Sequence, residues 1–128
     1  MSLGLSIGRA ARDAVRVQAG AGFAIASAGA KLWGRMLGGS FRKHGELTVV
    51  SDLPKWAFGR GGTCVGGVVL SNRSLDDTVL EHEDVHRQQW RRYGLLFIPM
   101  YFAAGIDPLK NRFEIEADLV KGGYVKAR

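Results

Sequence analysis

The sequence predicts an α+β fold in a single domain of 128 residues. Residues 1–40 are basic, rich in Ala and Gly, and place apolar residues at helical spacing. Residues 46–70 are rich in strand-forming residues, and two helical segments with start and stop signals follow. We therefore expect N-terminal helices and a small antiparallel sheet packed on a central helix and on a second helix near the C-terminus. No repeat or linker interrupts the chain, and residues 46–121 are the expected core.

The net charge of +6 is concentrated at the N-terminus. Residues 1–43 carry seven Lys/Arg against one acid, whereas residues 44–128 carry eleven of each sign. The expected core is electrically balanced, which argues against a nucleic-acid groove in it. The single cysteine, Cys64, excludes an internal disulfide framework and a thiolate zinc cluster.

The chain contains no apolar segment of the roughly 18 residues that a membrane span requires. The first thirty residues differ from an export signal, because arginines extend to Arg16 and the Ala/Gly run after them is only weakly hydrophobic. We therefore expect a cytoplasmic protein, with association to a membrane surface as the alternative that the basic N-terminal arm offers. The sequence does not indicate an oligomeric state.

Residues 3–36 predict two helical pieces, broken near Gly20–Gly22. Arg9, Arg12 and Arg16 gather on a different face from the apolar residues, so two interpretations stand. The helix packs its apolar stripe on the core, or it lies peripherally on an anionic membrane surface. The first is favoured, because the apolar face is mostly alanine and buries little area in lipid.

Three segments predict strands: Glu46–Leu53, Trp56–Phe58 and Thr63–Leu70. Gly66-Gly67 within the last segment indicates a bulge or a close backbone approach. A strand beside a site on the central helix can bind an extended peptide as a further strand, and Val65–Ser71 is the candidate. The other interpretation, compatible with the first, is an ordinary core strand that covers the helix.

Ser74 and Asp77 match a capping box, which predicts a helix from Leu75 to about Arg92 that Gly94 ends. The motif His82-Glu83-Asp84-Val85-His86 falls in the middle of this helix.

The motif has the H-E-x-x-H spacing, which places both imidazoles on one helix face, where they can ligate one zinc ion. Glu83 lies beside the first ligand, where a carboxylate can accept a proton from water on the metal. The alternative is a chance pair of surface histidines.

After this helix, Leu95–Ala104 predicts a buried helix bent at its proline, and Leu109–Lys121 predicts the last helix, ended by Gly122-Gly123. Tyr93 or Tyr101 could place a hydroxyl near the metal as an oxyanion stabiliser. For each, a core or interface role is the favoured interpretation.

The last helix contains Glu114-Ile115-Glu116-Ala117-Asp118, an E-x-x-A-D pattern. Together with H-E-x-x-H, it resembles the gluzincin metallopeptidases, including compact minimal versions of that fold. The resemblance implies a zincin-like fold, zinc as cofactor and a peptide or protein as substrate. It also implies His82, His86 and Glu114 as zinc ligands, Glu83 as general base, and Asp118 as the acceptor that orients a ligand imidazole.

Helix geometry also favours Glu114 over Glu116 as the third ligand. Residues two apart differ by about 200° around a helix, so only one of these carboxylates can face the motif. Ala117 and Asp118 share the face of Glu114, and the small alanine lets the two helices approach each other. We therefore expect Glu114 on the metal and Glu116 in solvent.

The leading functional hypothesis is a small zinc-dependent metallopeptidase-like hydrolase. The alternative is a non-catalytic zinc-stabilised domain that acts as a binding module, peripheral to a membrane through its basic N-terminal arm. Glu83 favours catalysis, because a purely structural zinc site needs no carboxylate at that position.

Overall fold

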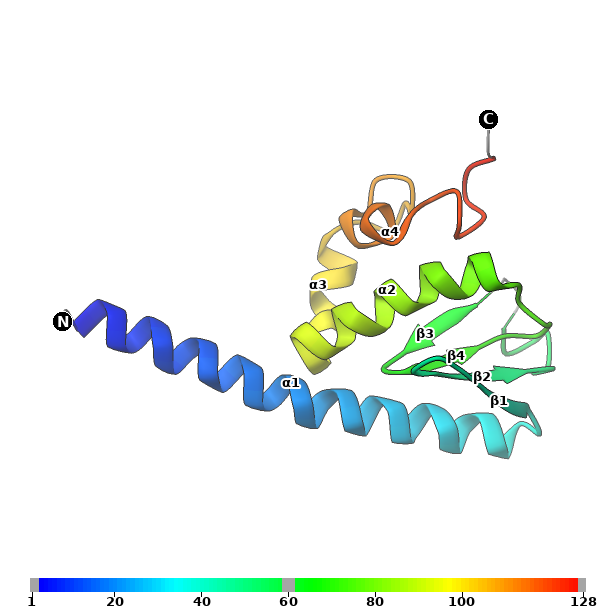
Figure 1. The fold of residues 1–128 in the computed structure, drawn as a ribbon, viewed down its shortest axis with the longest axis horizontal. Helices are drawn as coiled ribbons and strands as arrows, with labels where there is room; N and C mark the ends of the chain where they lie inside the picture. The colour runs from blue at the N-terminus through cyan, green and yellow to red at the C-terminus, as the bar shows by residue number, and fades with distance from the viewer. Residues whose placement is uncertain (1–2, 59–61, 127–128) are drawn as a thin grey trace.

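The computed structural model describes residues 3–58 and 62–126, and side chains from residue 7 onward. Four helices, one 3-10 turn and four strands make up the described chain and confirm the α+β class (Figure 1). The helices are α1 (Leu3–Met36), α2 (Asp77–Tyr93), α3 (Phe97–Ala103) and α4 (Arg112–Ala117), and the 3-10 turn η1 is Gly94–Leu96. The strands are β1 (Ser40–His44), β2 (Leu47–Ser51), β3 (Thr63–Val65) and β4 (Val68–Leu70).

The sheet is mixed, with the strand order β1-β2-β4-β3. β1 and β3 pair antiparallel with their neighbours, but β2 and β4 are parallel. The prediction of a purely antiparallel sheet is therefore wrong. Parallel neighbours need a crossover connection, and the segment between β2 and β4 supplies it by leaving the sheet and returning through β3.

Strand boundaries also differ from the prediction. Ser40–His44 is a strand that the sequence did not indicate, whereas the predicted strand Trp56–Phe58 is absent. Residues 55–57 form a turn instead, in which Ala57 and Phe58 both donate to the Pro54 carbonyl. Thr63–Leu70 is two strands, because Gly66-Gly67 forms the turn of a hairpin and Gly66 has a φ of +62°. β4 is paired on both sides, so β3 is the edge that could accept a further strand, instead of Val65–Ser71 as a whole.

The sheet lies between α1 and α2 (Figure 1). Successive side chains of a strand point to opposite faces, so β2 and β4 supply both cores. Val50, Val68 and Leu70 pack with Ala30 of α1. The residues that pack on the other face, toward α2, are Leu47, Val49, Val69, Leu75 and Leu80.

The first helix is continuous, so the predicted break near Gly20–Gly22 is wrong. Gly22 has a packing role instead, since a Cβ there would lie 2.7 Å from the Leu95 nitrogen. The glycine lets η1 lie directly against α1. The N-terminal part of α1 projects beyond the rest of the molecule (Figure 1). Within the described residues, no helix is both long and apolar enough to cross a membrane.

The helix α2 begins two residues later than predicted. Asp76, rather than Ser74, is the N-cap, and its Oδ1 accepts from the Val79 N–H at 2.9 Å. Gly94 ends the helix as predicted, with a φ of +60°.

The segments after α2 are shorter and more exposed than predicted. The buried helix expected over Leu95–Ala104 is η1 followed by α3, in which Phe97 is the one buried side chain. Ile98 and Phe102 are exposed, at 44% and 66%. The last helix spans only Arg112–Ala117 instead of Leu109–Lys121, because Asp118 takes a φ of +83° and turns the chain out of the helix.

The close contact at Gly22 predicts opposite effects for two substitutions in one helix. Gly22→Ala should lower the free energy of unfolding by about 1–3 kcal/mol, because its Cβ would overlap the Leu95 backbone. Gly20→Ala should raise it by about 0.5–1 kcal/mol, because nothing lies within 4 Å of its Cβ and alanine favours the helix. Urea denaturation measures both, and equal effects would contradict the packing role of Gly22.

Candidate metal centre

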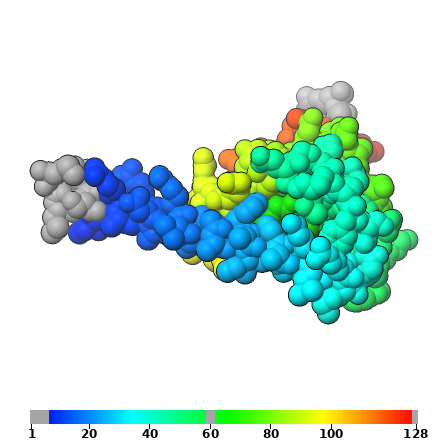
Figure 2. All heavy atoms as spheres, turned by 60° about the horizontal axis from the view of Figure 1, so that its bottom comes forward, coloured from blue at the N-terminus to red at the C-terminus, as the bar shows by residue number. Residues whose placement is uncertain are grey.

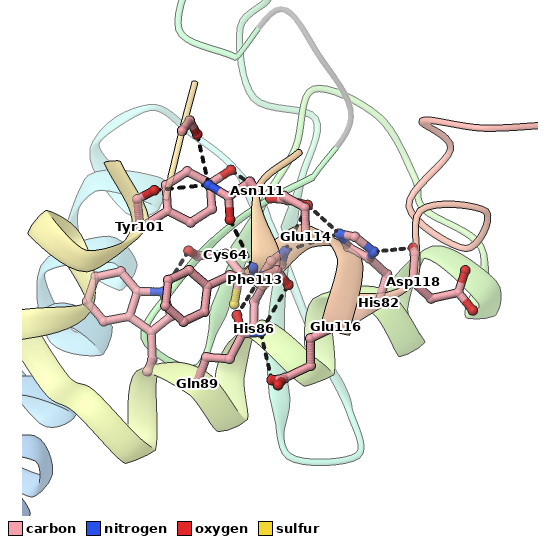
Figure 3. Close-up of polar contacts among 12 residues, drawn as sticks. Cys64, His82, His86, Gln89, Tyr101, Asn111, Phe113, Glu114, Glu116 and Asp118 are labelled. Carbon is pink, nitrogen blue, oxygen red and sulfur yellow. Dashed lines mark hydrogen bonds and ion pairs between the residues drawn. The ribbon is translucent and has the colours of Figure 1, made fainter. Parts of the chain in front are cut away.

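Three buried side chains bring ligand atoms together at one point between α2 and α4 (Figure 3). Nε2 of His82 lies 3.1 Å from Nε2 of His86 and 3.1 Å from Oε2 of Glu114, and His86 Nε2 lies 3.3 Å from the same oxygen. Their exposed fractions are 2%, 6% and 4%. The structure thus brings together the three residues that the sequence predicts as metal ligands.

The protonation of His82 follows from its second ring nitrogen. Nδ1 of His82 contacts the main-chain oxygen of Asp118 at 2.7 Å. A carbonyl oxygen only accepts, so the proton lies on Nδ1. In the neutral ring, the lone pair on Nε2 then faces the cluster, as metal ligation requires.

His86 is oriented in the same way by Gln89. Nδ1 of His86 lies 2.8 Å from Oε1 of Gln89. Nε2 of Gln89 donates to the Phe113 carbonyl and to Oε1 of Glu116, both at 3.0 Å. These two acceptors fix which way the amide points, so its oxygen must accept from Nδ1 of His86. Sequence reasoning missed Gln89, although a glutamine three residues after His86 shares its helix face.

The spacing of the three atoms fits a metal ion. A tetrahedral zinc-type ion with bonds of about 2.0–2.1 Å holds neighbouring ligands about 3.3 Å apart. The three observed separations are 3.1, 3.1 and 3.3 Å. Burial acts to raise the pKa of Glu114, but the neighbouring imidazoles of His82 and His86 outweigh it and hold that pKa well below its ordinary value. The group therefore supplies two imidazole nitrogens and one carboxylate, and it could hold a metal ion.

No family model, curated protein or solved structure significantly matches the chain. The likeness to the gluzincins therefore rests on the two motifs, and the metal centre rests on its geometry.

Tyr101 orients the third ligand. Its hydroxyl donates to Oε1 of Glu114 at 2.7 Å, leaving Oε2 for the cluster. Burial, followed by this hydrogen bond, raises the pKa of Tyr101, so the hydroxyl keeps its proton. Asn111, which is fully buried, caps α4 and donates to the carbonyls of Tyr101 and Gly105. Tyr101 therefore contacts a candidate ligand, whereas Tyr93 packs its ring against Phe113.

Asp118 contacts His82 through the main chain rather than through its carboxylate. Its Oδ1 accepts from the N–H groups of Val120 and Lys121, at 2.9 and 3.1 Å. Because the helix ends at Ala117, the turn at Asp118 directs its carbonyl toward His82 and its carboxylate into the next turn (Figure 3). Asp118 is the residue predicted to accept from a ligand imidazole. The group that accepts from His82 is its main-chain carbonyl, however, and not its carboxylate.

The turn after Asp118 covers His82, a feature that sequence reasoning missed. A Cβ on Gly122 would lie 2.6 Å from Nδ1 of His82, so only glycine fits there without displacing the ring. The Tyr124 ring also lies 5.9 Å from the His82 ring, centroid to centroid. The expected role of Gly122 was to end a helix, but its lack of a side chain lets the backbone pass over a ligand.

Glu83 is buried next to the cluster. Its exposed fraction is 4%, and Oε2 has no hydrogen-bond partner among the described residues. Burial raises the pKa of Glu83 to about 7. Glu83 lines a pocket of about 260 Å³ together with His86 and Glu114. Glu116, by contrast, is exposed and lies outside the cluster.

The geometry predicts different consequences for the two neighbouring glutamates. Glu114→Ala should weaken divalent-metal binding by orders of magnitude, because it removes one of three ligands. Glu116→Ala should change it little, because its carboxylate bonds, among the described residues, only to the Gln89 amide, which the Phe113 carbonyl also holds. Metal content after dialysis and competition with a chromogenic chelator measure both. Wild-type affinity in Glu114→Ala would contradict the assignment.

Gln89 and Gln88 form a second matched pair. Gln89→Ala should weaken metal binding by about 10–100-fold, because Nδ1 of His86 loses the acceptor that orients it. Gln88→Ala should leave it unchanged, because Gln88 is exposed and, within the described part of the chain, its side chain bonds only to Asp84. The same chelator competition measures both, and equal affinities would show that Gln89 does not orient His86.

Proposed function

We propose that this chain is a zinc-dependent hydrolase of peptide bonds, similar to the gluzincins. The observation that carries the proposal is the position of Glu83. Its carboxylate is buried, has no hydrogen-bond partner for Oε2 among the described residues, and shares a pocket with two of the three ligands. A site that served stability alone would gain nothing from an unpaired buried carboxylate, which is costly to desolvate.

Zinc is the metal that the donor set suits best. Two imidazoles and one carboxylate are a common catalytic zinc set, and three protein ligands leave a fourth position open. Zinc bound there would polarise a substrate carbonyl and lower the pKa of a water molecule.

The protein's own groups would position and protonate the reactants. Glu83 would accept the proton of the attacking water and pass it to the leaving amine. The Gln89 amide and the Asp118 carbonyl would keep both imidazoles in the ligating tautomer, and the Tyr101 hydroxyl would hold Glu114.

An extended peptide is the proposed substrate because the pocket adjoins the edge of the sheet. Thr63, Cys64 and Val65 of β3 line the pocket together with residues of α3. An edge strand can add a peptide through main-chain hydrogen bonds. The Cys64 carbonyl already accepts from the Trp90 indole at 3.1 Å, and Thr63 and Val65 pair with β4, so within β3 a peptide would pair through the Cys64 N–H.

A non-catalytic zinc-stabilised domain is the second candidate, and the size of α4 favours it. A six-residue helix is too short to be stable alone, and Glu114 would fix it to α2 through the metal. In that case zinc loss would unfold α4, and the protein would have no turnover to lose.

Glu83→Gln separates the two candidates. It should keep zinc bound but lower peptide cleavage by about two to four orders of magnitude, because the amide cannot accept the proton. Cleavage of denatured casein and of a quenched fluorescent peptide library measures the rate, and metal analysis measures zinc.

Glu81→Gln is the control, because Glu81 lies on the same helix but is exposed and pairs with Lys121. Undiminished cleavage by Glu83→Gln would exclude Glu83 as the base. Zinc-loaded wild type that cleaves none of these substrates would favour the stabilising role.

A further inference from the structure

The first helix carries an uncovered apolar stripe along its whole described length. Its positions repeat every three or four residues, which places them on one face. All nine are apolar and exposed: Ile7, Ala10, Ala14, Val17, Ala21, Ile25, Ala28, Leu32 and Met36. They span 29 residue steps, or about 44 Å at 1.5 Å per residue. Figure 2 shows this side of the molecule, where α1 runs across and no other segment covers it.

The stripe holds five of the larger apolar side chains of α1, whereas the α1 residues packed on the core are mostly small, apart from Phe23. The residues packed on the sheet and on η1 include Ala19, Gly22, Ala30 and Gly34. The exposed fractions on the stripe are 61% for Ile7, 75% for Val17, 63% for Ile25, 59% for Leu32 and 69% for Met36. Burial normally selects the large apolar residues, so this helix is built to bury its outer face against something else.

The part of α1 that extends beyond the core has one apolar face, which belongs to the stripe, and one basic face. Residues 7–17 are exposed with the exception of the half-buried Gly8. A helix of this length is marginal in water without packing. Arg9, Arg12 and Arg16 occupy the face opposite the stripe, and they form no salt bridge within the described chain.

Charge decides what covers the stripe. Helix α1 carries five basic residues against one acid, Asp13, so its net charge is +4. A second copy of α1 would bring two such helices together and gain no opposite charge. An anionic lipid surface attracts the basic residues and can bury the apolar stripe at the boundary between headgroups and acyl chains. We propose that α1 lies in the plane of an anionic bilayer with this stripe buried, and that it holds the domain at the membrane surface.

The inference does not depend on the proposed hydrolase, because no stripe residue contacts the metal centre. The favoured prediction that α1 packs this apolar stripe on the core is wrong, because Ile7, Ala10, Ala14 and Val17 are all exposed. Alanine fills four of the nine positions, but the five larger side chains supply most of the area that lipid can bury.

Co-sedimentation with vesicles tests the proposal on the full chain. Wild type should bind vesicles of phosphatidylcholine and phosphatidylglycerol in equal parts, bind pure phosphatidylcholine weakly, and lose affinity as salt rises. Arg12→Gln with Arg16→Gln should weaken binding to the mixed vesicles by about tenfold or more. Ile25→Ser with Leu32→Ser should weaken it on the order of 100-fold.

The matched control is Ile106→Ser with Leu109→Ser, which removes the same two residue types from exposed positions outside α1. It should bind as wild type does, and circular dichroism should show all variants folded. Equal loss in both double variants, or absence of wild-type binding to the mixed vesicles, would overturn the proposal. A dimer in light scattering that Ile25→Ser with Leu32→Ser dissociates would assign the stripe to a second copy instead.

Discussion

The convergence of one carboxylate and two imidazoles in a nearly dry space is the constraint on which the site depends. Burying an anionic Glu114 and two polar rings costs free energy unless each polar atom is satisfied. The surrounding structure satisfies all of them except the atoms that point at one another. The Asp118 carbonyl and the Gln89 amide oxygen accept hydrogen bonds from the two Nδ1–H groups, and the Tyr101 hydroxyl donates to one oxygen of Glu114. What remains is three lone-pair donors at the mutual spacing that a cation requires.

The helix that carries the motif was predictable because its signals are local. Its spacing, its acidic first turn and its terminal glycine all lie within the segment, so the ends differ by at most two residues from prediction. The choice of Glu114 over Glu116 was predictable for the same reason, since it needs only the rotation of two residues around a helix. The sheet was less predictable. Whether Gly66-Gly67 makes a bulge or a hairpin, and whether β2 meets β4 in parallel, depends on contacts with distant residues such as Ser27, which accepts from the Gly67 N–H.

The other differences between the predicted and the observed site arise because main-chain atoms make the contacts. A carbonyl oxygen is present at every residue, so no residue type marks the one at Asp118 that meets His82. Only the positive φ that ends α4 selects it. Gly122 is a similar case. A glycine at this position indicates a turn, but it does not indicate that the turn packs against the imidazole of His82. Gln89 differs from both. Its side chain stands at a helical spacing from His86 that sequence alone could have identified as a second contact to the ligand.

The two faces of α1 connect the site to the proposed membrane surface. The inner face packs on the sheet and, at Gly22, on η1, which leads directly into α3. Tyr101 of α3 holds Glu114, and Ile98 and Phe102 of α3 line the pocket. If the outer stripe of α1 is buried in a bilayer, its inner face would therefore position η1 and α3 at the membrane surface. Residues of α3 bound the pocket. Because the candidate metal ligands come from α2 and α4 instead, loss of lipid contact should change where the pocket is presented and leave these three residues in place.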